Sequence, residues 1–144
     1  MKNERSAGAI LFIKEKEPIY LLLQYEAKHW DFPKGNIEKG ETDHETVKRE
    51  IEEETGIKDI KIIHGFKKKI QYYFKVKAEL INKEVVFYLA QTKTEQIKLS
   101  FEHIGFEWLP FEEAKEKLTF KNAKEILENA NKFLKSHKTL EDFY

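Results

Sequence analysis

Residues 35–57 read GNIEKGETDHETVKREIEEETGI, and this stretch combines a well-marked helix with an unusual concentration of acid. Thr42 and Glu45 match the capping box, in which each side chain bonds the backbone of the other residue at a helix start. Gly56 suits the left-handed position that follows a helix. These signals predict a helix over residues 43–55.

Four of the last six residues of this helix are glutamates, at positions 50, 52, 53 and 54. Carboxylates are unfavourable at the negative end of a helix dipole, and like charges at i,i+4 repel one another. At about 100° per residue, Glu50, Glu53 and Glu54 share one face beside a short apolar stripe, whereas Glu52 points to the far side. The three converging carboxylates therefore need a neutralising partner.

Two interpretations of this acidic face compete. It can be a solvated charged surface, or it can bind a hard divalent cation. Arg49 lies four residues before Glu53 and can pair with it, which leaves Glu50 and Glu54 without a cation. Clustered carboxylates suit Mg²⁺ or Mn²⁺, and Mg²⁺ often shares its ligand shell with substrate phosphates. The second interpretation predicts attack of a metal-activated water on phosphorus.

Composition limits the remaining possibilities. The 144 residues fit one domain spanning 1–144, and the 26 basic side chains balance the 26 acidic ones. Net charge near zero argues against a general binder of nucleic acid or of acidic membranes. The absence of cysteine excludes disulfides and thiolate sites and fits a cytoplasmic location. No apolar run approaches the roughly 18 residues of a membrane span, and MKNERSAG lacks the apolar core of a signal peptide.

The rest of the chain predicts strands before and after the capped helix and two helices near the end. Strands are predicted at 6–14, 18–26, 60–66, 70–76, 84–91 and 105–110, with 29–41 mostly loop. Helices are predicted at 111–118 and 123–136, the second capped by Asn122. This order lacks βαβα alternation, and no GxGxxG or Walker motif occurs. We expect an α/β domain with helices packed on a mixed sheet.

The opening stretch resembles the Nudix box, Gly-x5-Glu-x7-Arg-Glu-U-x-Glu-Glu-x-Gly-U, where U is bulky and apolar. Every specified position matches, from Gly35 to Ile57. The resemblance implies an α/β/α sandwich around a mixed central sheet. It also implies hydrolysis of a nucleoside diphosphate linked to another group, with Mg²⁺ or Mn²⁺ as cofactor.

The resemblance also implies roles for individual residues. The implied metal ligands are the Gly35 carbonyl, Glu50, Glu53, Glu54 and, from outside the box, Glu102. Glu53 and Glu102 are competing candidates for the general base. Arg49 belongs to the implied catalytic group as an orienting residue, with Glu41 beside it. His103 follows Glu102 and is expected to shape its loop.

Three segments outside the box are similar to the asymmetrical diadenosine tetraphosphate hydrolase subfamily, and the similarity spans roughly residues 7–134. They are HWDFPKGNIEKGE, GFKKKIQYYF and LSFEHIGFEWLPFEEA. The implied reaction converts diadenosine tetraphosphate to ATP and AMP. The candidate substrate-binding residues are His29, Lys34, Lys67, Lys69, Tyr72 and Phe120.

Lysines suit a polyphosphate chain, and aromatic rings suit adenine. Lys67 and Lys69 are expected to line the same cleft as Lys34. The competing interpretations are a solvated strand edge for these two lysines and core packing for Tyr72 and Phe120.

Two alternative functions stay open at this point. One is another Nudix pyrophosphohydrolase activity, either removal of pyrophosphate from RNA 5′ ends or cleansing of nucleoside triphosphates. The neutral chain offers little basic surface for RNA. The other, of a different class, is a non-catalytic nucleotide-binding module. That function predicts a degraded box, and this box is intact.

Overall fold

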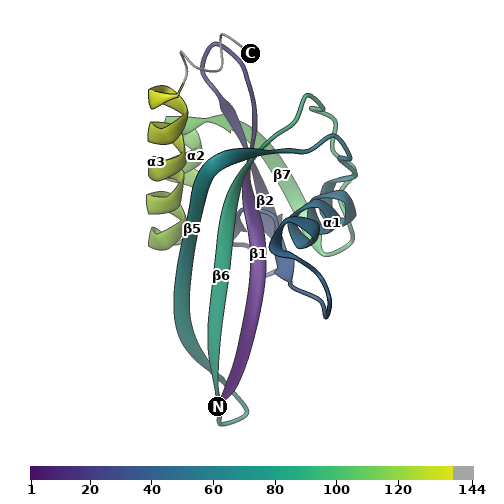
Figure 1. The fold of residues 1–144 in the computed structure, drawn as a ribbon. Coiled ribbons are helices and arrows are strands. Elements are labelled where there is room, and N and C mark those ends of the chain that lie inside the picture. Colours follow the sequence, from purple (N-terminus) through teal and green to yellow (C-terminus); the bar gives the residue numbers. More distant parts are fainter. Residues whose placement is uncertain (138–144) are drawn as a thin grey trace.

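The computed structural model describes residues 1–137 and arranges them as three layers (Figure 1). The strands are β1 (Lys2–Ile13), β2 (Ile19–Tyr25), β3 (Trp30–Asp31), β4 (Lys34–Asn36), β5 (Lys61–Val76), β6 (Glu79–Gln91) and β7 (His103–Pro110). The helices are α1 (Asp43–Thr55), α2 (Phe111–Lys117) and α3 (Lys121–Ser136). No helix in this described part is long and apolar enough to cross a membrane.

The sheet mixes parallel and antiparallel pairs. Its main order is β3-β2-β1-β6-β5, with β4 paired to β1 and β7 paired to β2. Only the β1–β6 pair among the described strands is parallel. Figure 1 shows α1 on one side of the sheet and α2 and α3 on the other. The predicted α/β class with a mixed central sheet is confirmed.

Each face of the sheet carries its own apolar core because strand side chains alternate between faces. In β1, Ile10 and Phe12 pack toward α3, in a cluster with Leu127. Ala9 and Leu11 point the other way, into a cluster with Val47 and Ile51 of α1 and with Leu21 of β2. The sheet therefore fixes α1 by its apolar stripe and leaves its acidic face turned elsewhere.

The local signals for α1 are confirmed. The helix spans Asp43–Thr55, both bonds of the capping box between Thr42 and Glu45 are present, and Gly56 has φ 78°. Residues 29–41 are less irregular than expected, because the edges of β2 and β1 pair with the short strands β3 and β4.

Several predicted boundaries are wrong. β1 and β6 begin at Lys2 and Glu79, earlier than the predicted starts at 6 and 84. The segments 60–66 and 70–76 form one strand, β5, whose pairing with β6 shifts between Ile62 and Lys67, around Gly65 at φ 98°. A bulge absorbs the extra residues without ending the strand. The helix predicted from Asn122 begins at Lys121, and Phe120 occupies the N-cap position without a side-chain bond.

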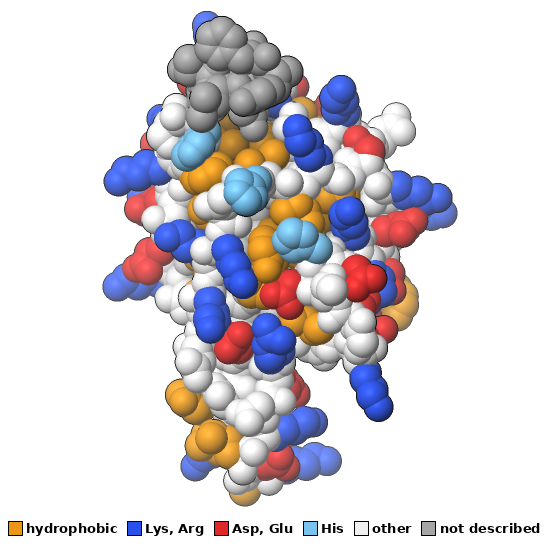
Figure 2. Space-filling view, in the orientation of Figure 1, with side chains coloured by type: hydrophobic (Ala, Val, Ile, Leu, Met, Phe, Trp, Pro, Cys, Tyr) orange, Lys and Arg blue, Asp and Glu red, His pale blue; other side chains and the backbone are white. Residues whose placement is uncertain are grey.

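The β5–β6 hairpin continues beyond the body of the protein (Figure 1). Lys77 and Ala78 form its two-residue turn with φ 49° and 68°, as tight hairpin turns require. Figure 2 shows hydrophobic side chains exposed over this projection. Those with substantial exposure are Tyr73, Phe74, Val76 and Leu80.

Candidate active site

Gly35 and Glu50 meet where β4 crosses α1. β4 pairs with β1, which places Gly35 opposite Ala7. A Cβ atom built on Gly35 would lie 2.0 Å from the carboxyl carbon of Glu50 and 2.1 and 2.4 Å from its oxygens. The Glu50 carboxyl therefore occupies the space that any larger residue at position 35 would fill. Its burial raises its pKa, although Arg49 works against this shift.

Glu54 is a buried carboxyl with little compensation. Its residue is 4% exposed, and its Oε2 has no hydrogen-bond partner within residues 1–137. Its Oε1 lies 3.7 Å from Nε2 of His103. Burial raises the pKa of Glu54, the charges of Glu50, Glu102 and Glu53 add to the shift, and together they bring it to about 9. An added cation would remove both the desolvation cost and the repulsion.

Arg49 organises the other carboxylates. Its Nε and Nη2 donate to the two oxygens of Glu41 at 2.6 and 3.0 Å, a bidentate geometry that fixes the guanidinium plane. Its Nη1 donates to Glu50 at 2.8 Å and to Glu53 at 3.2 Å. The expected pair with Glu53 is present. The expectation that Glu50 lacks a cation is wrong, because Arg49 reaches both residues.

The loop after Leu99 is tied to the end of α1. The Ser100 N–H donates to the Glu54 carbonyl at 3.3 Å, and the Ser100 hydroxyl lies 3.1 Å from Nδ1 of His103. His103 is buried, and this burial lowers its pKa. His103 thus shapes the loop as expected, and it also faces Glu54, which the sequence did not indicate.

A row of rings runs from this point across the protein surface. Tyr25 contacts His103 at 4.5 Å between centroids and stacks on His29 at 4.7 Å. His29 in turn lies 5.3 Å from Phe120. Tyr25 is held in place because its hydroxyl donates to the Phe32 carbonyl at 2.8 Å. The row connects the buried carboxyl of α1 with the start of α3.

A cavity of about 260 Å³ lies at the far end of this row. It brings together three predicted residues, Lys34, Tyr72 and Phe120, over an apolar floor that includes Phe87. Tyr72 and Phe120 are 37% and 48% exposed. Core packing therefore does not account for either ring. The Lys34 ammonium lies 3.0 Å from the carboxylate of Asp31, which also lines the cavity.

Lys67 and Lys69 do not line this cavity, contrary to expectation. They pair with Tyr88 and Val86, which belong to the core on the α1 side of the sheet. Because β5 alternates, its even-numbered positions around Tyr72 face the α3 side instead. Lys67 lies over the Tyr88 ring at 5.9 Å, and Lys69 lies 3.9 Å from Glu84.

Lys83 is a basic residue on the cavity side that sequence reasoning missed. It pairs across the hairpin with Tyr72, and its side chain is 13% exposed. Its Nζ lies 3.0 Å from Oδ1 of Asn36 and 3.6 Å from Glu4. Burial lowers its pKa, and nearby Lys34 adds to this shift. The register of the hairpin, once known, would have identified it.

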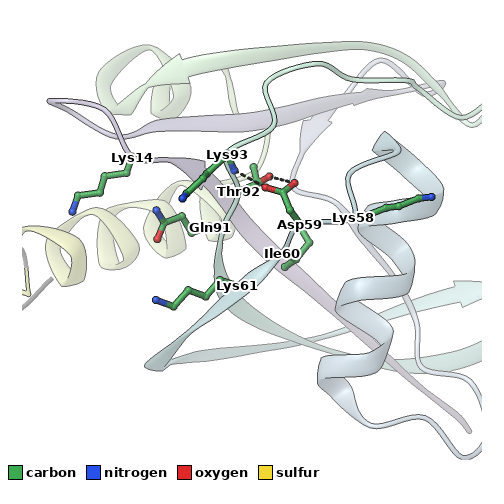
Figure 3. A pocket seen from close by; sticks show the side chains of 8 residues that line it. All are labelled: Lys14, Lys58, Asp59, Ile60, Lys61, Gln91, Thr92 and Lys93. Carbon is green, nitrogen blue, oxygen red and sulfur yellow. Dashed lines mark hydrogen bonds between the residues drawn. The ribbon is translucent and has the colours of Figure 1, made fainter. Parts of the chain in front are cut away.

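A larger cavity of about 720 Å³ lies at the other end of the strands (Figure 3). Exposed lysines line its rim, and its only carboxylate, Asp59, already accepts bonds from Thr92, Thr94 and the backbone of Lys93. The buried side-chain atoms of residues 1–137 that lack a hydrogen bond lie elsewhere, on Glu54, His103 and Glu107, and the Glu107 oxygen pairs with the Lys117 ammonium. Nothing in this cavity matches the chemistry predicted from the sequence.

Comparison with known proteins agrees with this geometry. The family model of the NUDIX domain matches residues 2–130. The chain belongs to the NUDIX family. The asymmetrical bis(5′-nucleosyl)-tetraphosphatase of Mus musculus is 37% identical over 143 residues, which cover 90% of this chain and 95% of that protein.

Two further comparisons bear on this NUDIX protein. The structure of a C. elegans Ap4A hydrolase binary complex superposes with a TM-score of 0.81 at 25% identity, covering 92% of this chain and 98% of that one. An RNA pyrophosphohydrolase of Nitratiruptor sp. is 41% identical over 64 residues, which are 44% of this chain and 39% of that protein. The NUDIX-type sandwich predicted from the sequence is confirmed.

NUDIX hydrolases use divalent metal cations, and the acidic residues described above fit such an ion in chemistry. The buried Oε2 of Glu54 has no hydrogen bond and is a hard oxygen ligand, and the charges of three further carboxylates, Glu50, Glu53 and Glu102, act on it. As they stand, no three acidic or histidine side chains within residues 1–137 are close enough together to hold a metal. Two of these carboxylates, on Glu50 and Glu53, are paired with Arg49 at 2.8 and 3.2 Å.

Proposed function

We propose that this NUDIX hydrolase cleaves diadenosine tetraphosphate to ATP and AMP. The observation that carries the proposal is the cavity bounded by Tyr72 and Phe120, linked by the ring row to Glu54. A nucleoside site thus lies at a distance from the acidic cluster, as a long polyphosphate substrate requires. The similarity to asymmetrical tetraphosphatases over nearly the whole chain supports the same substrate class.

The cavity would hold one adenosine. Its two exposed rings, Tyr72 and Phe120, present flat faces to a base, and such stacking is worth about 1–3 kcal/mol per base. Lys34 and Lys83 would then contact the phosphates, since Lys34 lines the cavity and lies next to Gly35 on β4, and Lys83 pairs with Tyr72 and donates to Asn36 of β4. His29, in the middle of the ring row, would border the phosphate chain.

Glu50, Glu53, Glu54, Glu102 and the Gly35 carbonyl would hold the divalent ion, which we take to be Mg²⁺, with Mn²⁺ as the alternative. When bound, such an ion neutralises charge on phosphoryl oxygens and lowers the pKa of a water ligand. Arg49 would keep its two bonds to Glu41 and release Glu50 and Glu53. The bidentate pair with Glu41 makes this exchange possible without moving the guanidinium.

The chain's own residues would then place the water and take up its proton. Water oxygen bonds to an outer phosphorus, the bridging P–O bond breaks, and ATP and AMP leave. Glu53 and Glu102 are both solvent-exposed and both act electrostatically on Glu54. Either carboxylate can accept the proton once the geometry of the bound substrate is set. We also propose a cytoplasmic enzyme, on the absence of cysteine.

A comparison of turnover on three classes of substrate tests the proposal. The folded protein is incubated with Mg²⁺ and diadenosine tetraphosphate, 5′-triphosphorylated RNA or dNTPs, and the products are resolved by chromatography. Production of ATP and AMP much faster than any other product supports the proposal. Preference for RNA or dNTPs favours the other NUDIX activities. No turnover of any substrate favours a non-catalytic nucleotide-binding module.

A further inference from the structure

Phe101 is an exposed aromatic residue beside the candidate active site. It is 90% exposed, which is unfavourable for a large apolar side chain in water. It directly precedes Glu102, whose charge acts on Glu50 and Glu54 in addition to their burial. The proposed binding of the first adenosine by Tyr72 and Phe120 makes no use of it.

The loop fixes where Phe101 lies. Phe101 and Glu102 form the centre of a turn closed by the His103 N–H, which donates to the Ser100 carbonyl at 3.3 Å. The Ser100 N–H in turn donates to the Glu54 carbonyl at 3.3 Å. The buried ring of His103 anchors the other side of the turn. Phe101 is thus held in a tight turn whose first residue, Ser100, is bonded to the backbone of Glu54.

The proposed substrate has two nucleosides, and the cavity suits only one. Its volume of about 260 Å³ is below the roughly 300–1,000 Å³ typical of drug-sized ligands. The second nucleoside leaves as AMP, so a single phosphate separates it from the reacting phosphorus. It must therefore lie next to the acidic cluster, on the side away from the cavity that holds the ATP half.

We propose that Phe101 stacks on the base of the nucleoside that leaves as AMP. This inference rests on the proposed function and adds a second, open subsite to it. A ring that stacks offers no hydrogen bonds to the base edges. The subsite should therefore favour any dinucleoside tetraphosphate over a mononucleoside one, with little choice among bases.

Kinetics with and without the second nucleoside test this subsite. The substrates are diadenosine tetraphosphate, adenosine–guanosine tetraphosphate and adenosine 5′-tetraphosphate, which lacks the second nucleoside. For Phe101→Ala we expect kcat/KM to fall about tenfold for both dinucleotides and to change less than about twofold for adenosine 5′-tetraphosphate. Phe101→Tyr should retain the dinucleotide rates. If the mononucleotide is not turned over, its inhibition constant replaces kcat/KM.

Tyr73→Ala is the matched control. Tyr73 is 57% exposed and lies on the β5 face that points away from the cavity, so its loss should not change selectivity. Equal losses for mononucleotide and dinucleotides, or no change for either, would overturn the inference. The inference would also be overturned if Phe101→Ala changed the molecular mass of the protein in solution but left the preference for dinucleotides unchanged. Phe101 would then be a contact between copies of the chain. A folded wild type that does not cleave diadenosine tetraphosphate would instead refute the proposed function.

Discussion

The carboxyl of Glu50 lies against the backbone of Gly35, where a Cβ atom would be 2.0 Å from its carboxyl carbon. This close approach explains why the box needs glycine there: a side chain would displace Glu50. The contact also joins β4 to α1 and so sets the acidic face of α1 against β4, the strand that begins with Lys34.

Gly35→Ala should therefore reduce turnover without unfolding the protein. Displacing the Glu50 carboxylate, which we propose binds the metal, by about 1 Å should cost on the order of 100-fold in kcat. Steady-state kinetics and a melting curve check this. Gly105→Ala is the control, because a Cβ there meets Gln24 only at 3.4 Å. Equal rates for both variants would contradict the proposed role of position 35.

Glu54 predicts the pH dependence of stability in the metal-free protein. Its pKa is raised from 4.5 to about 9, so between these values the folded state keeps a proton that the unfolded state has lost. This destabilises the folded state increasingly as pH rises from 4.5 to 9. Glu54→Gln should remove the effect and stabilise the protein by roughly 2–3 kcal/mol near pH 7, with little change near pH 4.5.

Urea unfolding in EDTA at several pH values measures this difference. His103 is present in both proteins, so its contribution to the pH dependence largely cancels in the difference between their free energies of unfolding. Glu52→Gln serves as the control, since Glu52 is half-exposed and its side chain faces Lys58. Parallel stability curves for wild type and Glu54→Gln would show that this carboxyl does not titrate abnormally.

Mg²⁺ should stabilise the wild type more than Glu54→Gln. A ligand at 100 times its Kd stabilises the folded state by about 2.7 kcal/mol. The variant lacks the buried carboxylate that gains the most free energy from ion binding, so its stabilisation should be smaller. Differential scanning calorimetry across a Mg²⁺ series checks this independently of activity. Identical shifts in both proteins would place the ion elsewhere.

Variants of Lys83 and Lys67 test which face of the sheet binds the polyphosphate, because the two lysines lie on opposite faces. Lys83→Gln should raise KM for diadenosine tetraphosphate about tenfold, since one phosphate contact is lost. Lys67→Gln should change KM less than about twofold, because Lys67 lies on the α1 side. The reverse order of effects would mean that the polyphosphate crosses the other face.

Local signals were sufficient to predict α1 and its acidic residues. The capping box, the terminal Gly56 and the helix period depend only on neighbours in sequence. The same period separated Glu52 from the other three glutamates, and the structure leaves Glu52 exposed as expected. What the period could not show is that Glu54 is buried whereas Glu53 is 58% exposed.

Features that depend on strand register were not predictable in the same way. The faces of Lys67, Lys69 and Lys83 are set by how β5 pairs with β6 across a bulge and a two-residue turn. One residue of shift moves every side chain to the other face. The contact between His103 and Glu54, and the ring row through Tyr25, likewise join segments far apart in the chain.

Product analysis on diadenosine tetraphosphate with Mg²⁺ tests the proposed function most directly. The wild type should yield ATP and AMP in equal amounts, and Glu54→Gln should lose most of this turnover while its melting temperature is kept or raised. Formation of two ADP molecules, or full activity in Glu54→Gln, would contradict the assignment.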